Sequence, residues 1–192
     1  MNAKPTFLLA VLSASLGIGT VHGRECAGIS FPEELRSDGT TLKLNGLGLR
    51  EATIFKVDVY VAALYVTQTS RDAGTILNSN TPKELVLHFV RDVDRADVNK
   101  GWQEGFEKNA QGALSALKER IEAFKALMPD MKTGQRLRLV SKPGAGVQVD
   151  INDTVKGTIK GDDFSRALFS IWLGPHPPNP GLTAGLLGGP CG

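Results

Sequence analysis

The longest β-prone run of the chain covers residues 42–66 and has the sequence LKLNGLGLREATIFKVDVYVAALYV. From residue 55 its odd positions form an almost unbroken apolar row of Phe55, Val57, Val59, Val61, Ala63 and Tyr65. Its even positions are mixed and include Lys56, Asp58 and Tyr60. A period of two with one apolar face is typical of a strand half-buried against a core. The run therefore predicts one long core strand that ends near Val66.

Arg50 stands at the start of this strand, after Gly46 and Gly48. Glycine permits a positive φ or a close backbone approach, and we expect these two to form a turn from a short strand at residues 41–44 into the long one. A cation at the end of a core strand could receive an anionic or carbonyl-bearing ligand. The alternative is a structural arginine that satisfies carbonyls or pairs with an acid, because a buried unpaired arginine is costly.

Beyond the long strand, strand and helix patterns follow without a strict βαβ alternation. The chain before it is expected to be irregular over residues 24–40. The expected strands lie at residues 84–91, 135–142, 147–151 and 154–160. The expected helices lie at residues 70–78, between Asp94 and Pro129 as one helix bent at Gly112 or as a pair, from Gly161 to Gly174, and after Asn179. This order predicts an α+β fold, with an antiparallel sheet and a helical layer packed on one face as an open-faced sandwich.

Aromatic side chains supply further candidates for a binding site. Trp102 and Phe106 lie four residues apart on the helix expected after Asp94, where they form either the wall of a ligand cavity or ordinary core. Tyr60 is a candidate ligand contact or a core tyrosine with a satisfied hydroxyl. Trp172 is expected in the core. His88 and His176 have no partner nearby in the sequence for metal or acid–base chemistry, and we expect neither a metal site nor a cofactor.

The first 23 residues have the features of a secretory signal peptide. Lys4 precedes an apolar run at residues 7–12, and small residues follow up to Gly23. The apolar run is too short to span a membrane, which needs ~20 residues. We therefore expect a signal peptide at residues 1–23, one domain at residues 24–192, and a periplasmic or secreted protein. Loss of Lys4 would lower the net charge from +2 to +1, so no basic field remains that would attract nucleic acid.

The chain contains two cysteines, Cys26 and Cys191, near the ends of the expected domain. In an oxidising compartment they allow a single internal disulfide, which could stabilise the fold by roughly 4–5 kcal/mol in the chain-entropy model. The alternative is two free thiols on frayed ends. Neither cysteine belongs to a C-x-x-C motif, which argues against redox catalysis and zinc binding.

Three segments, in matching order, resemble the bacterial chalcone isomerase-like family over residues 29–188. Residues 45–66 are similar to its G-x-G-x-R and Y-V-A-x-L-Y signature, residues 102–109 (WQEGFEKN) to one of its helices, and residues 164–188 to its closing F-x-x-A-L-x-x-I-W-L-G motif. The resemblance implies a large antiparallel sheet under a helical layer, with a cleft between them.

The resemblance extends to two kinds of function. In plant chalcone isomerases an arginine that matches Arg50 holds the substrate anion, but a threonine lies near the position of Tyr60. Their next helix supplies a tyrosine and an asparagine seven residues apart, where this chain has Asp97 and Glu104. In a fatty-acid-binding branch of the fold, an arginine and a tyrosine hold the carboxylate. Arg50 and Tyr60 fit that pairing only if a bulge or bend near residues 51–54 brings them together, because ten residues of unbroken strand span ~33 Å.

These observations favour a non-catalytic protein that binds a small apolar or amphiphilic ligand between sheet and helices. Arg50, Tyr60, Trp102 and Phe106 are the candidate ligand contacts. The alternative is an intramolecular lyase or isomerase in which Arg50 stabilises an enolate or phenolate. A further alternative is an envelope protein that recruits an unknown protein partner and has no ligand.

Overall fold

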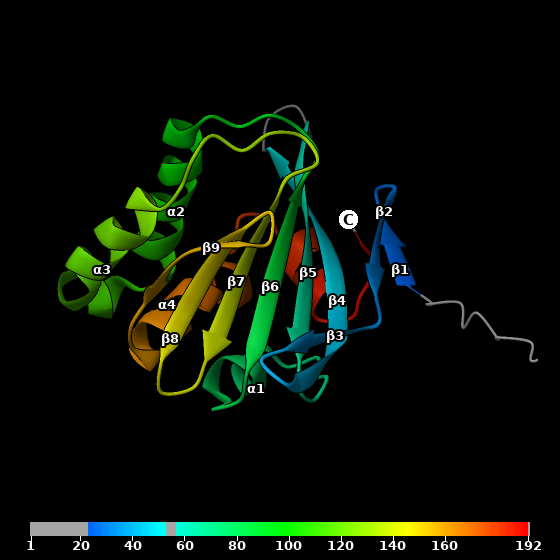
Figure 1. Ribbon diagram of the computed structural model, residues 1–192, viewed down its shortest axis with the longest axis horizontal. Coiled ribbons are helices and arrows are strands. Elements are labelled where there is room, and N and C mark those ends of the chain that lie inside the picture. The colour runs from blue at the N-terminus through cyan, green and yellow to red at the C-terminus, as the bar shows by residue number, and fades with distance from the viewer. Residues whose placement is uncertain (1–22, 53–56, 192) are drawn as a thin grey trace, which may run out of the picture.

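The computed structural model describes residues 23–52 and 57–191, which form a curled antiparallel sheet with helices packed on it (Figure 1). The sheet has seven strands in sequence order, so each strand pairs with its neighbour in the chain. These strands are β3 (Glu34–Ser37), β4 (Thr40–Ala52), β5 (Val57–Val66), β6 (Lys83–Phe89), β7 (Arg136–Lys142), β8 (Gly146–Ile151) and β9 (Thr154–Ile159). A separate hairpin of β1 (Gly23–Cys26) and β2 (Ile29–Pro32) lies beside β4. The predicted α+β class is confirmed.

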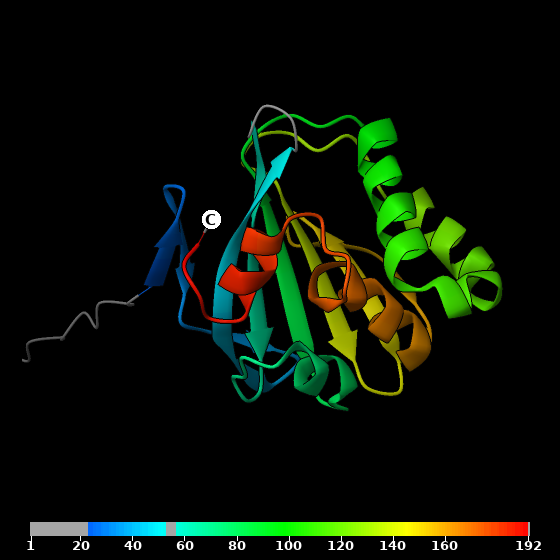
Figure 2. The same ribbon diagram turned by 180° about the vertical axis from the view of Figure 1, so that it is seen from behind.

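The helices lie on one side of the sheet, as the view from behind shows (Figure 2). They are α1 (Ala73–Asn78), α2 (Arg95–Asn109), α3 (Leu114–Ala126), α4 (Asp162–Leu173) and α5 (Pro180–Leu186). Asp94 caps α2 by accepting a hydrogen bond from the backbone N–H of Asp97 at 2.8 Å, which satisfies an otherwise unpaired donor. A short 3₁₀ turn at Gln111–Ala113 separates α2 from α3, so the predicted helical region is a pair. None of the described helices has the length and apolar character needed to cross a bilayer.

Gly46 and Gly48 lie inside β4, and the prediction that they form a turn is wrong. Their role is a close approach of two backbones. A Cβ atom on Gly46 would overlap the carbonyl oxygen of Gly185, and one on Gly48 would overlap that of Leu182. Helix α5 therefore rests directly on the backbone of β4, where only glycine leaves enough space.

Strand β5 is buried on both faces, whereas the sequence predicted a half-buried strand. Ala62, Leu64 and Val66 pack under the helices. Val61, Ala63 and Tyr65 belong to a second apolar cluster on the opposite face of the sheet, which includes Phe31 of the β1–β2 hairpin. The hydroxyl of Tyr65 donates to the carbonyl oxygen of Pro32 at 2.9 Å. Residues 24–40, expected to be irregular, thus contain β1, β2 and β3, and part of this region covers the second face.

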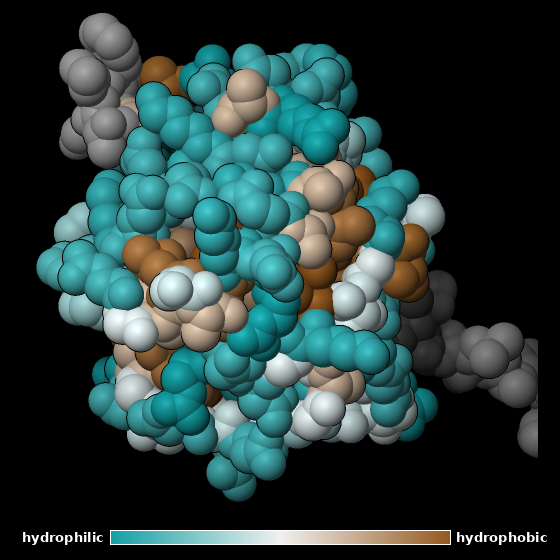
Figure 3. All heavy atoms as spheres, turned by 90° about the vertical axis from the view of Figure 1, so that its left-hand side faces the viewer, coloured by the Kyte–Doolittle hydropathy of each residue, from teal (hydrophilic) through white to brown (hydrophobic). Residues whose placement is uncertain are grey.

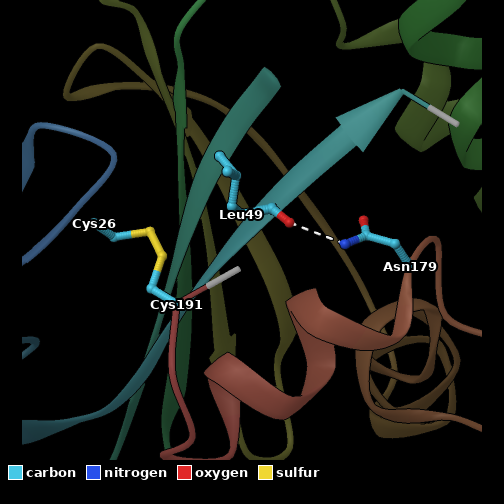
Figure 4. Close-up of a disulfide and its surroundings, with 4 residues drawn as sticks. All are labelled: Cys26, Leu49, Asn179 and Cys191. Atoms are coloured by element: carbon cyan, nitrogen blue, oxygen red, sulfur yellow. Dashed lines mark hydrogen bonds between the residues drawn. A yellow bond between two sulfur atoms is a disulfide. The ribbon is translucent and has the colours of Figure 1, made fainter. Parts of the chain in front are cut away.

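A disulfide joins Cys26 in β1 to Cys191, which follows α5, with 5.8 Å between their Cα atoms (Figure 4). It fastens the end of the chain to the hairpin on the second face of the sheet. Figure 4 also shows Asn179, at the start of α5, donating from its side-chain amide to the carbonyl oxygen of Leu49 at 3.0 Å. The first link attaches the last part of the chain to the hairpin, and the second attaches the start of α5 to β4, next to Arg50.

Candidate functional site

A cavity of about 650 Å³ opens between the ends of β4, β5 and β6 and the helices α2 and α4. We call it the Arg50 cavity. Its walls combine aromatic and aliphatic side chains with charged groups, among them Arg50, Tyr60, Phe89, Arg91, Asp97, Lys100, Trp102, Glu104, Ile171, Trp172 and His176. The volume lies within the usual range for small-molecule sites, ~300–1,000 Å³. On the face that carries α2 and α3, hydrophobic side chains remain visible among hydrophilic ones (Figure 3).

Arg50 and Tyr60 are direct partners across β4 and β5, although ten residues separate them in the sequence. The two strands are antiparallel, and Ala52 at the end of β4 is paired with Val57 at the start of β5. The pairing register shifts after Arg50, where Val59 of β5 is left without a partner in β4, but the antiparallel pairing of the two strands and not this irregularity brings Arg50 and Tyr60 together. Of residues 51–54, where a bulge or bend was expected, 53 and 54 lie outside the described residues. Side chains opposite each other in antiparallel strands have Cβ atoms ~5 Å apart. The two candidate head-group contacts therefore lie side by side in the cavity wall, and the expected single strand is in fact a pair of strands.

The positive charge of Arg50 has no carboxylate within 4.0 Å among the described residues. Its guanidinium donates to the backbone carbonyl of Glu51. A guanidinium has five N–H donors, so donors remain for a ligand. The guanidinium thus satisfies a backbone carbonyl, as the structural interpretation of Arg50 expects, while none of the described carboxylates neutralises its charge.

Tyr60 accepts a hydrogen bond from the indole N–H of Trp172, with 3.0 Å between the nitrogen and the phenol oxygen. Burial raises the pKa of Tyr60, against smaller lowering effects of the Trp172 hydrogen bond and the Arg50 charge. The phenol is consequently protonated at neutral pH. Because Trp172 already supplies a donor to the phenol oxygen, the O–H of Tyr60 is left as a donor for another acceptor.

The two aromatic residues expected from α2 have different positions. Trp102 lines the cavity, and its ring meets that of Trp172 edge-on with 5.6 Å between centroids. Its indole N–H is buried without a hydrogen-bond partner among the described residues. Phe106 is fully buried against Phe124 and Phe164 and is not part of the cavity lining.

Sequence reasoning missed Trp172, which was assigned to the core alone. It is 1% exposed, yet it lines the cavity and orients Tyr60. His176 also lines the cavity, because the side-chain oxygen of Asn109 on α2 accepts a hydrogen bond from the backbone N–H of His176 at 3.0 Å. The closing motif that contains Trp172 was recognised, but nothing in a single sequence shows that its indole N–H faces Tyr60.

The cavity rim carries charges of both signs. Asp97 and Glu104, which stand where the resemblance places neutral residues in plant isomerases, both line the cavity. Lys108 pairs with Glu104 at 3.6 Å, and Lys100 lies between Asp97 and Glu104 on α2. Within residues 23–52 and 57–191, no cluster of three or more potential metal ligands occurs. The cavity thus places a cation and a phenol at one point of a wall that mixes aromatic, aliphatic and charged side chains.

Comparisons with known proteins agree with this architecture. The sequence profile of the family described as chalcone isomerase-like matches residues 23–188. A search of curated protein sequences found no significant match. Among solved structures, the fold is similar to that of a fatty-acid binding protein of Arabidopsis thaliana, with a TM-score of 0.67 and 18% sequence identity over 83% of this chain and 92% of that chain. At this identity the likeness establishes the fold alone.

Proposed function

Because the chain belongs to the chalcone isomerase-like family, we propose that it binds an acidic amphiphile of the fatty-acid type in the Arg50 cavity without transforming it. The observation that supports this proposal most directly is the pairing of Arg50 with Tyr60 inside the cavity. The fatty-acid binding protein of similar fold supports the choice of ligand class.

The ligand carboxylate would lie against Arg50 and Tyr60. A guanidinium and a phenol can donate to both oxygens of one carboxylate, and hydrogen bonds that involve a charge contribute ~1.5–3 kcal/mol. The tail would extend along Trp102, Trp172 and Ile171, where each buried methylene contributes ~0.8 kcal/mol. Head group and tail thus contribute separately, and an experiment can distinguish the two contributions.

The residues on α2 favour binding over isomerisation. Where the resemblance places a tyrosine and an asparagine in plant isomerases, this chain has Asp97 and Glu104, and carboxylates cannot donate a hydrogen bond to a developing phenolate or enolate. The cavity volume also favours a ligand over the alternative of a closed interaction protein.

The test compares the binding of dodecanoate and its methyl ester by isothermal titration calorimetry. Arg50→Gln should weaken dodecanoate binding at least tenfold and leave the binding of the ester unchanged, because the ester carries no charge. Tyr60→Phe should weaken dodecanoate binding about two- to tenfold through the loss of one neutral donor. Arg36→Gln, at an exposed position of β3 that is not part of the cavity, is the matched control and should bind as the wild type does.

Unchanged dodecanoate affinity in Arg50→Gln would refute the proposal. Turnover of a chalcone by the wild type, lost in Arg50→Gln, would replace it with the intramolecular lyase.

We also propose that the protein is exported to the periplasm or the cell exterior. Residues 1–22 lie outside the described part of the chain, so support comes from their sequence and from the disulfide, since such bonds persist in oxidising compartments. N-terminal sequencing of the mature protein should begin at Arg24. A mature protein that begins at Met1 would contradict cleavage.

A further inference from the structure

A second pocket, of about 270 Å³, lies at the opposite end of the sheet, between the end of α1, the start of β6 and the first turns of α4. We call it the Lys83 pocket. Lys83 begins β6 and Phe89 of the Arg50 cavity ends it, so the two sites are separated by ~20 Å of extended strand. The lining of the Lys83 pocket is polar, with hydroxyls and amides beside two cations, Lys83 and Arg166.

Lys83 is an unusual residue for a protein interior, since it is only 6% exposed. The ammonium donates to the carbonyl oxygen of Ser79 at 3.1 Å and lies 5.9 Å from the ring centre of Phe169. No carboxylate of the described residues comes within 4.0 Å of it. Burial lowers the pKa of Lys83 and nearby Arg166 lowers it further, while Asp162 raises it. A buried ammonium normally has an ionic partner, because desolvation of an unpaired charge is costly.

The second cation, Arg166 on α4, lines the same pocket. Its guanidinium donates to the side-chain oxygen of Asn78 at 2.8 Å, and no carboxylate of the described residues lies within 4.0 Å. Asp162 is the acidic residue of the lining, and its carboxylate accepts a hydrogen bond from the backbone N–H of Gly144 at 2.9 Å. Two cations and one anion leave the pocket with a net positive charge.

Hydroxyl groups complete the lining. Ser141 is the cross-strand partner of Lys83, and its hydroxyl lies 2.6 Å from that of Ser165 in a buried hydrogen bond. One of these two hydroxyls must donate to the other, so the accepting hydroxyl keeps a proton for another acceptor. Ammonium, guanidinium and hydroxyl donors therefore line one small pocket, and such donors are typical of oxyanion recognition.

We propose that the Lys83 pocket binds a small oxyanion, either free phosphate or the phosphate or carboxylate group of a small molecule. The anion accepts from Lys83, from Arg166 and from the Ser141–Ser165 pair, and it supplies the negative charge that the buried ammonium lacks. This site is independent of the Arg50 cavity, so either proposal can fail without the other.

The test is an NMR titration of backbone amides with inorganic phosphate and, separately, with acetate, both at constant ionic strength maintained with sodium chloride. We expect saturable shifts at the amides of Ser79, Thr81 and Ser165. Lys83→Met keeps the length of the side chain and removes its charge, and it should weaken binding at least tenfold. Lys118→Met, at an exposed position of α3, is the matched control and should leave binding unchanged. Saturation by phosphate but not acetate identifies a phosphate site, and the reverse identifies a carboxylate site.

Arg166→Gln provides a second variant, because Arg166 is exposed and its substitution leaves the core intact. It should weaken binding at least threefold even if Lys83→Met does not fold. Absence of saturable shifts with both anions, or wild-type affinity in folded Lys83→Met or in Arg166→Gln, would overturn the proposal.

Discussion

Replacement of Gly46 by alanine should separate α5 from the sheet. The new Cβ would meet the carbonyl oxygens of Gly185 and Leu186, which are backbone atoms and cannot rotate away. Helix α5 buries Leu182 and Leu186 completely, and full burial of a leucine contributes ~1.5–3 kcal/mol. Because a displaced helix keeps part of this burial, we expect Gly46→Ala to lower the free energy of unfolding by about 2–4 kcal/mol.

Urea unfolding followed by tryptophan fluorescence measures this loss. Gly101→Ala is the matched control, since Gly101 lies within α2 and an added Cβ there meets no atom within 4 Å. That control should be neutral or more stable by up to ~1 kcal/mol, because alanine favours helix. If Gly46→Ala were as stable as the wild type, the close approach of α5 to β4 would be refuted as the reason for this glycine.

Two further predictions concern an ion pair and the disulfide. The hydrogen bond from Arg120 is the main reason that the pKa of Asp163 falls from 3.8 to about 2. The ionised Asp163 therefore contributes to stability above pH 3.8, and this contribution is lost as the pH falls toward 2. Asp163→Asn should lower the free energy of unfolding by less than ~1 kcal/mol at neutral pH, since the ion pair is exposed. In urea unfolding measured over a series of pH values, the variant should lose less stability between pH 4 and pH 2 than the wild type does. An equal loss in both proteins would contradict the role given to Asp163. Cys191→Ser should lower the free energy of unfolding by ~2–5 kcal/mol, and dithiothreitol should have the same effect on the wild type. Equal urea midpoints of the wild type with and without dithiothreitol would show that the bond to Cys26 contributes nothing.

Much of the architecture was predictable because local patterns and packing agree. Strands β6 to β9 and the cap at Asp94 follow from alternation and turn chemistry in the sequence. The reversal of direction between β4 and β5 could not be predicted, because residues 51–56 (EATIFK) contain no glycine, proline or asparagine to mark a turn. Two paired strands therefore have the sequence pattern of a single strand, and only the pairing register of β4 and β5 shows that Arg50 lies beside Tyr60.

The other differences between the sequence-based predictions and the structure also arise from contacts between segments that are distant in the sequence. Gly46 and Gly48 have no local requirement for glycine, and α5, some 140 residues later, explains them. The double burial of β5 depends on a hairpin whose strands are only four residues long, too short to show a clear period. The helical spacing of α4 predicts a core position for Trp172. Its hydrogen bond to Tyr60 could not be predicted, because it depends on which residue of β5 faces the indole nitrogen.

The bond between Cys26 and Cys191 also determines how the protein responds to mechanical force. A load applied to the two ends of the chain would pass through the sulfur atoms and would not shear β3 from β4 or peel α5 from the sheet. An unfolding enzyme that pulls one end of the chain through a narrow pore would meet a covalent loop closed by two cysteines 165 residues apart in the sequence. It would have to admit two chain segments at once or wait until the ring is opened by a reductant.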